Sequence, residues 1–432
     1  MNFTRNQKIL IAAMGGVVLI LLLVFVGILP GLKKKETRKV AANLQFWGVY
    51  DSVAAYEGAI NAFSRANPGV EIAYRGFSDP EEYESTLLNA LAVGKGPDIF
   101  MVRNTDLLRD ATKIAPVPVS KLSVLGLRNL FPQIVESDFA PDGREIFALP
   151  LSIDTLALIY NQDFFNEAAI VSPPKTWTEL EMIVPKLLRK ENGYIKKAAI
   201  ALGGSLRSIG NAPDILSLLM LQSGTEMISR DYRSAAFAST DGEEAMNFYL
   251  KFADPRNTAY SWNDEMKKAR EAFAAGEVAM ILDYASALPA IRSRNTTLNV
   301  GVAEAPQPAT AEKVITFGNY WGYAVSRQSR YVNTAWDFVL SLVTGENAKN
   351  YQVITGKPPA LRALINQLLN DPSLSVFAKQ SLVARAWPQV DYNKTSGFLS
   401  DAIESVLSGR ASVRNALQEA EGKVTDLLIK RL

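Results

Sequence analysis

The feature that most constrains the fold is a regular alternation of strand-like and helix-like segments that begins near residue 44. Residues 44–47 form an apolar strand pattern, and residues 53–66 carry apolar side chains at helical spacing before an Asn-Pro-Gly stop. A strand at 70–74, a capped helix that ends at Gly94 and a strand that starts at Pro97 follow. This order predicts an α/β fold with doubly wound, parallel sheets.

The chain is long and apolar enough for two or three domains, with 432 residues of which 48% are hydrophobic. It has no cysteine and no histidine. Thiol nucleophiles, disulfides, imidazole bases and the common thiolate or imidazole metal sites are therefore excluded. We expect no cofactor and no metal. The chain also lacks the residues that many enzyme classes use for catalysis.

The net charge of +2 comes from the N-terminus, where seven basic residues up to Lys39 stand against Glu36 alone. The remainder holds 39 basic and 43 acidic residues. A mildly acidic body lacks the electrostatic footprint of a nucleic-acid binder. We expect no nucleic-acid partner.

An uncharged apolar run occupies residues 9–32 and matches the roughly 20 residues that a helix needs to cross a bilayer. A cleaved signal peptide has a shorter apolar core, of about 7–15 residues. The sequence therefore predicts a cytoplasmic segment at 1–8, an uncleaved transmembrane anchor at 9–32 and a basic stalk at 33–43.

Several motifs carry a family resemblance. Residues 142–180 read DGREIFALPLSIDTLALIYNQDFFNEAAIVSPPKTWTEL, and FAAGEVAM at 273–280, GNYWGYAVS at 318–326 and AWDF at 335–338 follow. Together with the opening alternation, these motifs resemble extracellular solute-binding protein family 1, the maltose-binding-protein-like subunits of ABC sugar importers. The resemblance runs in the same order over roughly residues 44 to 430.

The resemblance implies a periplasmic-binding-protein fold of type II, with a hinge between two discontinuous lobes. Lobe 1 would hold residues 44–150 and 320–366, and lobe 2 would hold 155–316 and 371–432. It also implies a monomer that captures a small solute, a sugar or oligosaccharide in the first place, and delivers it to ABC permease subunits without altering it. The large domain would then lie on the extracytoplasmic side of the cell membrane, although the flanking basic residues favour the opposite orientation.

Receptors of this class bind where strand ends and helix N-termini face the cleft between the lobes. Polar groups there would bond ligand hydroxyls, and aromatic faces would stack on a sugar ring. The candidates are Trp47, Tyr50, Asp51, Arg103, Asn104, Asp106, Asp154, Asn211, Asp214, Asp283, Tyr284, Tyr320, Trp321, Arg385 and Trp387, with Tyr392 close by in the chain.

Several of these candidates could have a structural role instead of a role in binding. Trp47 sits in a strand and suits a core position equally well, and Trp336 has the helical spacing of a core residue. Many sugar-binding relatives carry Gly-x-Trp after the Ala-Met strand, whereas this chain has Asp283 and Tyr284 there. Tyr284 is the residue that could replace the missing Trp platform.

Two other function classes are alternatives to an importer subunit. A tethered sensor that docks on a signalling partner fits the same sequence features, and the sequence does not separate it from an importer subunit. A membrane-anchored carbohydrate-active enzyme would need an acid and a base, but the pair Asp163 and Glu167 lies in a helix and has the pattern of a solvated face.

Overall fold

The computed structural model describes residues 4, 5, 14, 16 and 41–431. Apart from residues 4, 5, 14 and 16, the predicted segments 1–8 and 9–32 lie outside the described residues, as does most of the stalk predicted at 33–43. Of the helices in the described part, none has both the length and the apolar character that crossing a bilayer requires.

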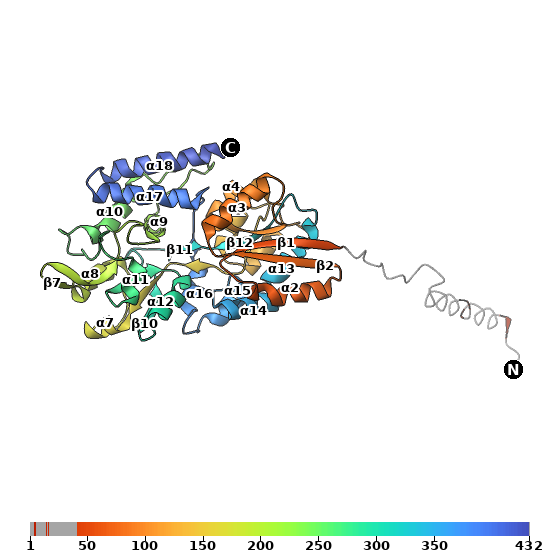
Figure 1. Ribbon diagram of the computed structural model, residues 1–432, viewed down its shortest axis with the longest axis horizontal. Helices are drawn as coiled ribbons and strands as arrows, with labels where there is room; N and C mark the ends of the chain where they lie inside the picture. Colours follow the sequence, from red (N-terminus) through yellow and green to blue (C-terminus); the bar gives the residue numbers. More distant parts are fainter. Residues whose placement is uncertain (1–3, 6–13, 15, 17–40, 432) are drawn as a thin grey trace.

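Two lobes lie side by side, each built around its own five-stranded sheet (Figure 1). The sheet of lobe 1 has the order β2-β1-β3-β12-β4. Its strands are β1 (Ala42–Val49), β2 (Val70–Phe77), β3 (Ile99–Arg103), β4 (Leu149–Pro150) and β12 (Trp321–Val325). The helices of this lobe are α2 (Ala54–Ala66), α3 (Pro80–Ala92), α4 (Leu107–Asp110), α5 (Val124–Leu130), α6 (Gln133–Phe139), α13 (Val332–Val343), α14 (Gly345–Thr355) and α15 (Arg362–Leu368), with the 3-10 turns η1 (Asn104–Asp106) and η2 (Ala111–Lys113).

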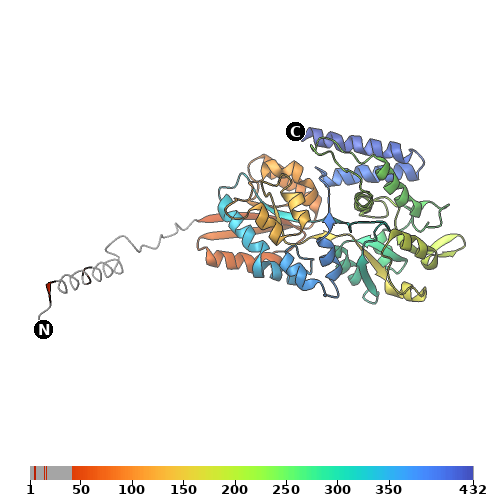
Figure 2. The same ribbon diagram turned by 180° about the vertical axis from the view of Figure 1, so that it is seen from behind.

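Lobe 2 contains a second sheet, of order β10-β6-β9-β8-β7. Figure 2 shows the two lobes from behind. Its strands are β6 (Ala157–Asn161), β7 (Arg189–Glu191), β8 (Tyr194–Ala201), β9 (Val278–Asp283) and β10 (Val300–Glu304). Its helices are α7 (Gln162–Glu167), α8 (Trp177–Leu187), α9 (Ala212–Gln222), α10 (Thr240–Leu250), α11 (Ala269–Ala274), α12 (Leu288–Arg294), α16 (Ser375–Ser381), α17 (Tyr392–Leu407) and α18 (Val413–Lys430), with η3 (Lys251–Ala253) and η4 (Ala285–Ala287).

A small third sheet, of order β13-β11-β5, connects the lobes. It is made of β5 (Asp154–Thr155), β11 (Thr316–Asn319) and β13 (Ala384–Arg385). The chain changes hydrophobic core close to these strands, because Ile153 packs in the core of lobe 1 and Leu156 in that of lobe 2. The lobe limits given by the sequence stay predictions.

The prediction of parallel sheets is confirmed only in part. Strand β1 pairs in parallel with β2 and β3, and β8 pairs in parallel with β9. Strands β12 and β6 instead run antiparallel to their neighbours. Both strands enter their lobe directly from a connection between the lobes, without the helical crossover that a parallel neighbour needs. Both sheets are therefore mixed.

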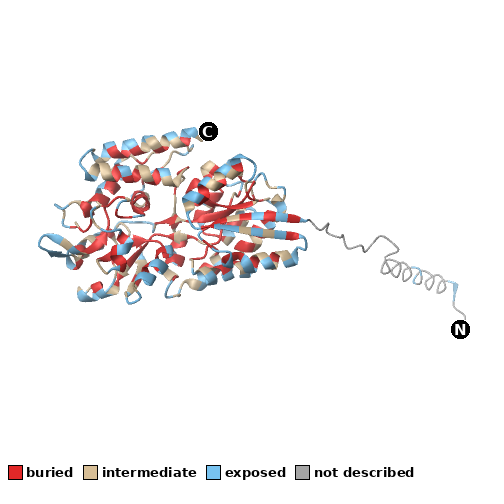
Figure 3. Ribbon diagram, viewed as in Figure 1, coloured by how far each residue is buried: buried red, intermediate tan, exposed pale blue. Residues whose placement is uncertain are grey.

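The alternation of side chains in β1 explains the layers of lobe 1. Leu44 and Phe46 are fully buried, and the ring of Phe46 contacts Tyr56 on α2 and Phe338 on α13. Trp47 points to the opposite face and packs against Phe77. Buried residues concentrate along both sheets in Figure 3. Helices thus cover the two faces of the sheet, as the predicted doubly wound arrangement requires.

Several local predictions are confirmed. Asp79 caps α3 by accepting hydrogen bonds from the backbone N–H groups of Glu81 and Glu82. Thr176 caps α8 through a bond from Glu179 N of 3.1 Å. Trp336 is fully buried in the core of lobe 1, where its indole N–H donates to the carbonyl of Ala115.

We expect Gly242→Ala to destabilise lobe 2. A Cβ at Gly242, in the first turn of α10, would lie 1.9 Å from the carbonyl oxygen of Phe237, so the backbone must shift. The free energy of unfolding should fall by about 1–3 kcal/mol, the usual cost of overpacking, as measured by chemical denaturation. In the control Gly58→Ala, no heavy atom beyond the neighbouring backbone of α2 lies within 4 Å of the new Cβ, and stability should rise by roughly 0.5–1 kcal/mol. Equal effects of the two changes would contradict the packing described.

Candidate functional site

Side chains of lobe 2 and of the connecting sheet meet around Asp214, which is buried in the first turn of α9. One carboxylate oxygen, Oδ2, accepts hydrogen bonds from the hydroxyl of Tyr284 at 2.6 Å and from that of Tyr392 at 3.0 Å. The amide of Asn319 donates to the same oxygen at 3.4 Å. Burial raises the pKa of Asp214, and these three bonds oppose the shift. The carboxylate therefore joins the end of β9, the end of β11 and the start of α17.

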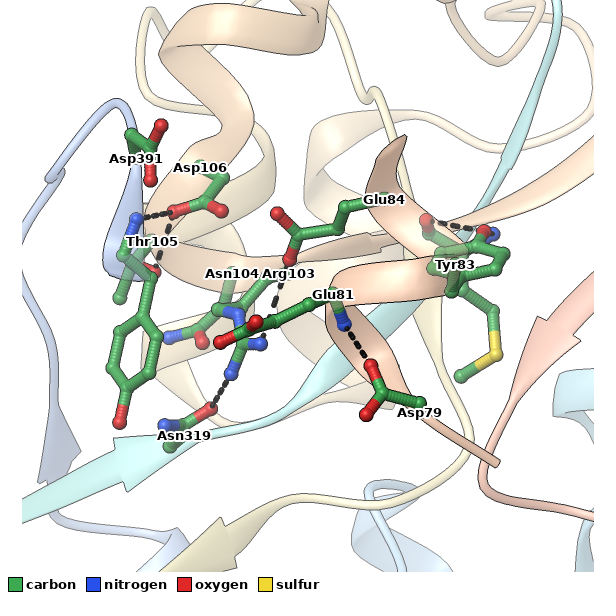
Figure 4. Close-up of polar contacts among 12 residues, drawn as sticks. Asp79, Glu81, Tyr83, Glu84, Arg103, Asn104, Thr105, Asp106, Asn319 and Asp391 are labelled. Atoms are coloured by element: carbon green, nitrogen blue, oxygen red, sulfur yellow. Dashed lines mark hydrogen bonds and ion pairs between the residues drawn. The ribbon is translucent and has the colours of Figure 1, made fainter. Parts of the chain in front are cut away.

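Arg103 lies between two aromatic rings that belong to different lobes. Its guanidinium carbon is 4.5 Å from the ring centre of Trp321 at the start of β12, and 4.2 Å from that of Tyr392 in lobe 2. The side chain is only 5% exposed. Its hydrogen bonds to Glu84 and Asn319 are long, at 3.5 and 3.4 Å (Figure 4). The guanidinium is thus held by stacking more than by hydrogen bonds.

Asp106, at the end of η1, joins the same group from lobe 1. Its Oδ1 accepts bonds from Tyr392 N and from the hydroxyl of Thr105, both of 3.0 Å. Its Oδ2 has Arg109 at 3.5 Å but no hydrogen bond. Burial raises the pKa of Asp106 to about 7, and Arg109 and Arg103 limit the rise.

Three polar atoms of this region are buried and lack a hydrogen-bond partner among the described residues. They are Arg103 Nε, Asp106 Oδ2 and Ser396 Oγ, the last one turn after Tyr392 on α17. A buried polar group without a partner is rare in folded proteins, since it costs about 1–3 kcal/mol. One donor, one acceptor and one hydroxyl at this place are therefore buried without a well-formed hydrogen bond, although the hydroxyl of Ser396 interacts with Tyr392.

Two other candidates face a carboxylate of lobe 1. Asn104 and Tyr320 both donate to Oδ2 of Asp138 on α6, at 2.9 and 2.8 Å. Burial raises the pKa of Asp138 to about 7, and the two bonds oppose the rise. Asn104 and Tyr320 thus hold in place the segment that carries Arg103 and Asp106.

Asp154 lies in β5, one of the strands that connect the lobes, and bonds to lobe 2. Its carboxylate accepts from the backbone N–H groups of Ala285 and Ser286, at 2.9 and 3.0 Å. Burial raises its pKa, and these backbone bonds counteract the rise. The residue thereby fixes the turn that follows β9, which carries Tyr284.

Asp283 and Asn211 also have partners within lobe 2. The guanidinium of Arg270 donates two hydrogen bonds to the carboxylate of Asp283, at 2.5 and 2.7 Å. The amide of Asn211 donates to the carbonyl of Leu282 at 2.9 Å. A hollow of about 380 Å³ opens beside this pair and is lined in part by Lys268 and Arg270. These contacts hold the end of β9 in place.

Asp51 and Tyr50 form a turn after β1. The carboxylate of Asp51 accepts from Lys357 Nζ at 2.6 Å and from the hydroxyls of Tyr351 and Tyr56 at 2.7 and 3.1 Å. Tyr50 has a φ of +70°, is 52% exposed and meets Trp321 edge to face. Asp51 therefore anchors the turn, and Tyr50 offers its ring to the region between the lobes.

Three candidates lie away from this group. Trp47 packs under Arg75 and Phe77 on the sheet of lobe 1. Trp387 is buried in the core of lobe 2, where its indole N–H donates to Ser217. Arg385 lies in β13 and bonds to the carbonyl of its neighbour Ala384.

The candidates predicted from the sequence that the structure brings together are Tyr50, Arg103, Asp106, Asp214, Tyr284, Trp321 and Tyr392. The sequence reasoning missed Glu84, Asp138, Asn319 and Ser396. Asn319 directly precedes Tyr320 in a connecting strand, and Ser396 follows Tyr392 by one turn, so their spacing could have suggested both. Within residues 41–431, no cluster of three or more acids has the geometry of a metal site.

Comparison with known proteins gives a family match. The family model described as bacterial extracellular solute-binding protein matches residues 58–372. A protein of Brucella abortus that is named only as a binding protein is 23% identical over 390 residues, which cover 87% of this chain and 90% of the relative.

Solved structures share the fold. The sugar-binding protein MalE of Xanthomonas citri superposes with a TM-score of 0.75 at 20% identity, over 90% of this chain and 98% of that one. A solute-binding protein of Thermotoga lettingae, solved with α-D-tagatose, gives a TM-score of 0.71 at 22% identity, over 90% of this chain and all of the other. These similarities show the two-lobed α/β fold.

We expect Asp138→Asn to change how stability depends on pH. Folding raises the pKa of Asp138 from near 4 to about 7, so the folded protein holds this proton more tightly than the unfolded chain does. The free energy of unfolding therefore falls as pH rises from about 4 to about 7. An asparagine can accept the same two hydrogen bonds but does not ionise. Urea denaturation between pH 4 and pH 8 should show that the free energy of unfolding of the variant, relative to that of the wild type, rises by roughly 1–4 kcal/mol over this range. Parallel plots of unfolding free energy against pH for the two proteins would refute the assignment.

Proposed function

From the premise that this chain belongs to the bacterial extracellular solute-binding proteins, we propose that it captures a carbohydrate between its lobes and delivers it to an ABC permease. Membership of this family makes the chain a binding protein and not an enzyme. Capture is non-covalent, and closure of the lobes forms the surface that the permease recognises.

The unpartnered atoms at the lobe boundary carry the proposal of a sugar. A sugar hydroxyl both donates and accepts hydrogen bonds, and neighbouring hydroxyls can do so with two protein groups at once. One hydroxyl can accept from Arg103 Nε while its neighbour donates to Asp106 Oδ2, and Ser396 Oγ can bond to either. A fully ionised ligand such as a phosphate would accept from Arg103 but would meet the carboxylates of Asp106 and Asp214. A neutral polyhydroxylated solute therefore satisfies more of these groups.

Aromatic side chains in the same region suit the apolar face of a sugar ring. Tyr50 is half exposed beside Trp321, which is the usual setting for stacking on a sugar. Two of the structurally similar proteins add support, because one is named as sugar-binding and the other was solved with a monosaccharide.

We further propose that the protein is a monomer held at the cell membrane by residues 9–32, with the lobes on the extracytoplasmic side. The support is the uncharged apolar run, which matches the length of a bilayer-spanning helix. The basic residues at 33–39 can lie against anionic headgroups as a stalk.

We expect Ser396→Ala to weaken sugar binding without loss of stability. The change removes a buried hydroxyl that makes no well-formed hydrogen bond and interacts only with Tyr392, so the melting temperature should change little. Isothermal titration with maltooligosaccharides, galactooligosaccharides and ketohexoses should show about a tenfold loss of affinity for whichever sugar the wild type binds. Ser405→Ala, farther along α17, is the matched control and should bind as the wild type does. Unchanged binding in Ser396→Ala would remove this hydroxyl from the site.

The anchor proposal has its own test. The full chain should stay in the membrane pellet after a high-salt wash, because burial of about 20 apolar residues does not depend on ionic contacts. The same chain without residues 1–40 should be found in the soluble fraction, as judged by immunoblotting. Release of the full chain by salt would show that only its basic residues attach it.

A further inference from the structure

The backbone is strained at Val390, where lobe 2 meets lobe 1. The N–H of Asp391 donates to the carbonyl of Gln389 at 2.8 Å, and Val390 between them has a φ of +67°. This geometry is a γ-turn with a positive central φ, the rarer and more strained of the two γ-turn forms. A β-branched residue makes it costlier still, because the left-handed region crowds its Cβ.

Hydrogen bonds to lobe 1 flank the strained turn on both sides. Before it, Gln389 N donates to the carbonyl of Thr105 at 2.8 Å. After it, Tyr392 N donates to Oδ1 of Asp106 at 3.0 Å. Both acceptors belong to η1 of lobe 1, whereas Val390 packs in the core of lobe 2. The turn thus presents two backbone donors, three residues apart, to the other lobe, and the bonds that they make offset the strain.

Arg103 adds a third contact between the lobes. Its guanidinium fills the space between Trp321 of lobe 1 and Tyr392 of lobe 2. Tyr392 is fixed at its other end, since its hydroxyl bonds to Asp214. The slot between two aromatic rings, which suits a flat ligand, is occupied by a side chain of the protein itself.

We propose that residues 389–392 and Arg103 form a latch that closes the lobes on each other in the absence of solute. The inference rests on the proposed role of lobe closure in solute capture and adds a regulation of the same site. A solute can enter the space between the lobes only while they are open, so its apparent affinity falls as the latched population rises. The strain at Val390 weakens the latched state and keeps it reversible.

The latch can be measured without any solute, because the distance between the lobes reports it. The chain has no cysteine, so Asn89→Cys on α3 and Gln418→Cys on α18 place one dye on each lobe at exposed positions. Single-molecule energy transfer on the full chain in lipid nanodiscs then gives the ratio of closed to open molecules. Wild-type protein without solute should show a populated closed state.

Two variants should shift this ratio in opposite directions. Val390→Gly relieves the backbone strain of the latched state and should raise the closed-to-open ratio by roughly tenfold. Arg103→Lys keeps the charge but loses the planar group that stacks on both rings, and should lower the ratio severalfold. The control Ala169→Gly relieves a positive φ of 52° in an exposed turn of lobe 2, outside the latch, and should leave the ratio unchanged.

The outcomes separate the latch from the proposed function. If a sugar closes the lobes but both variants keep the wild-type ratio without solute, the latch is refuted and sugar capture stands. If the variants shift the ratio but none of the tested sugars binds, the latch stands and sugar capture is refuted. A γ-turn that persists in the open form would change the melting temperature of Val390→Gly without moving the ratio, and this result too would overturn the latch.

Discussion

The arrangement of the site depends on one buried carboxylate, that of Asp214. Because a buried charge needs partners, three donors from distant parts of the chain converge on its Oδ2. Tyr284 brings the end of β9, Asn319 brings the end of β11, and Tyr392 brings the start of α17. Tyr392 then reaches across to Arg103 and Asp106, so this carboxylate determines where lobe 2 presents its groups to lobe 1.

The satisfied and unsatisfied polar groups of the lobe boundary have different roles. Asp51 and Asp154 are saturated by bonds to the protein and hold turns in place. Arg103, Asp106 and Ser396 each keep an atom without a partner. Fixed residues around unsatisfied ones are what a pre-organised binding site needs, since the ligand then gains hydrogen bonds without ordering the protein. Burial is the largest cause of the raised pKa values of the four acids Asp106, Asp138, Asp154 and Asp214.

Local sequence patterns predicted much of the fold, but they could not predict contacts between residues that are far apart in the sequence. Caps such as Asp79 depend on residues two or three positions away, and the burial of Trp336 follows from helical spacing, so both could be predicted. The sequence reasoning also named Asp214 and Tyr284, but their bond joins residues 70 positions apart and has no local signal. Asp138 was missed because its partners lie 34 and 182 positions away, and nothing near it on α6 distinguishes it from a surface acid.

The most direct test of sugar capture is a crystal structure of the protein with the oligosaccharide that binds it most tightly in solution. The account predicts neighbouring hydroxyls within hydrogen-bond distance of Asp106 Oδ2 and Ser396 Oγ, with a sugar ring against Tyr50 or Trp321. A sugar bound elsewhere, with Arg103 still between Trp321 and Tyr392 and the three atoms still without partners, would contradict it.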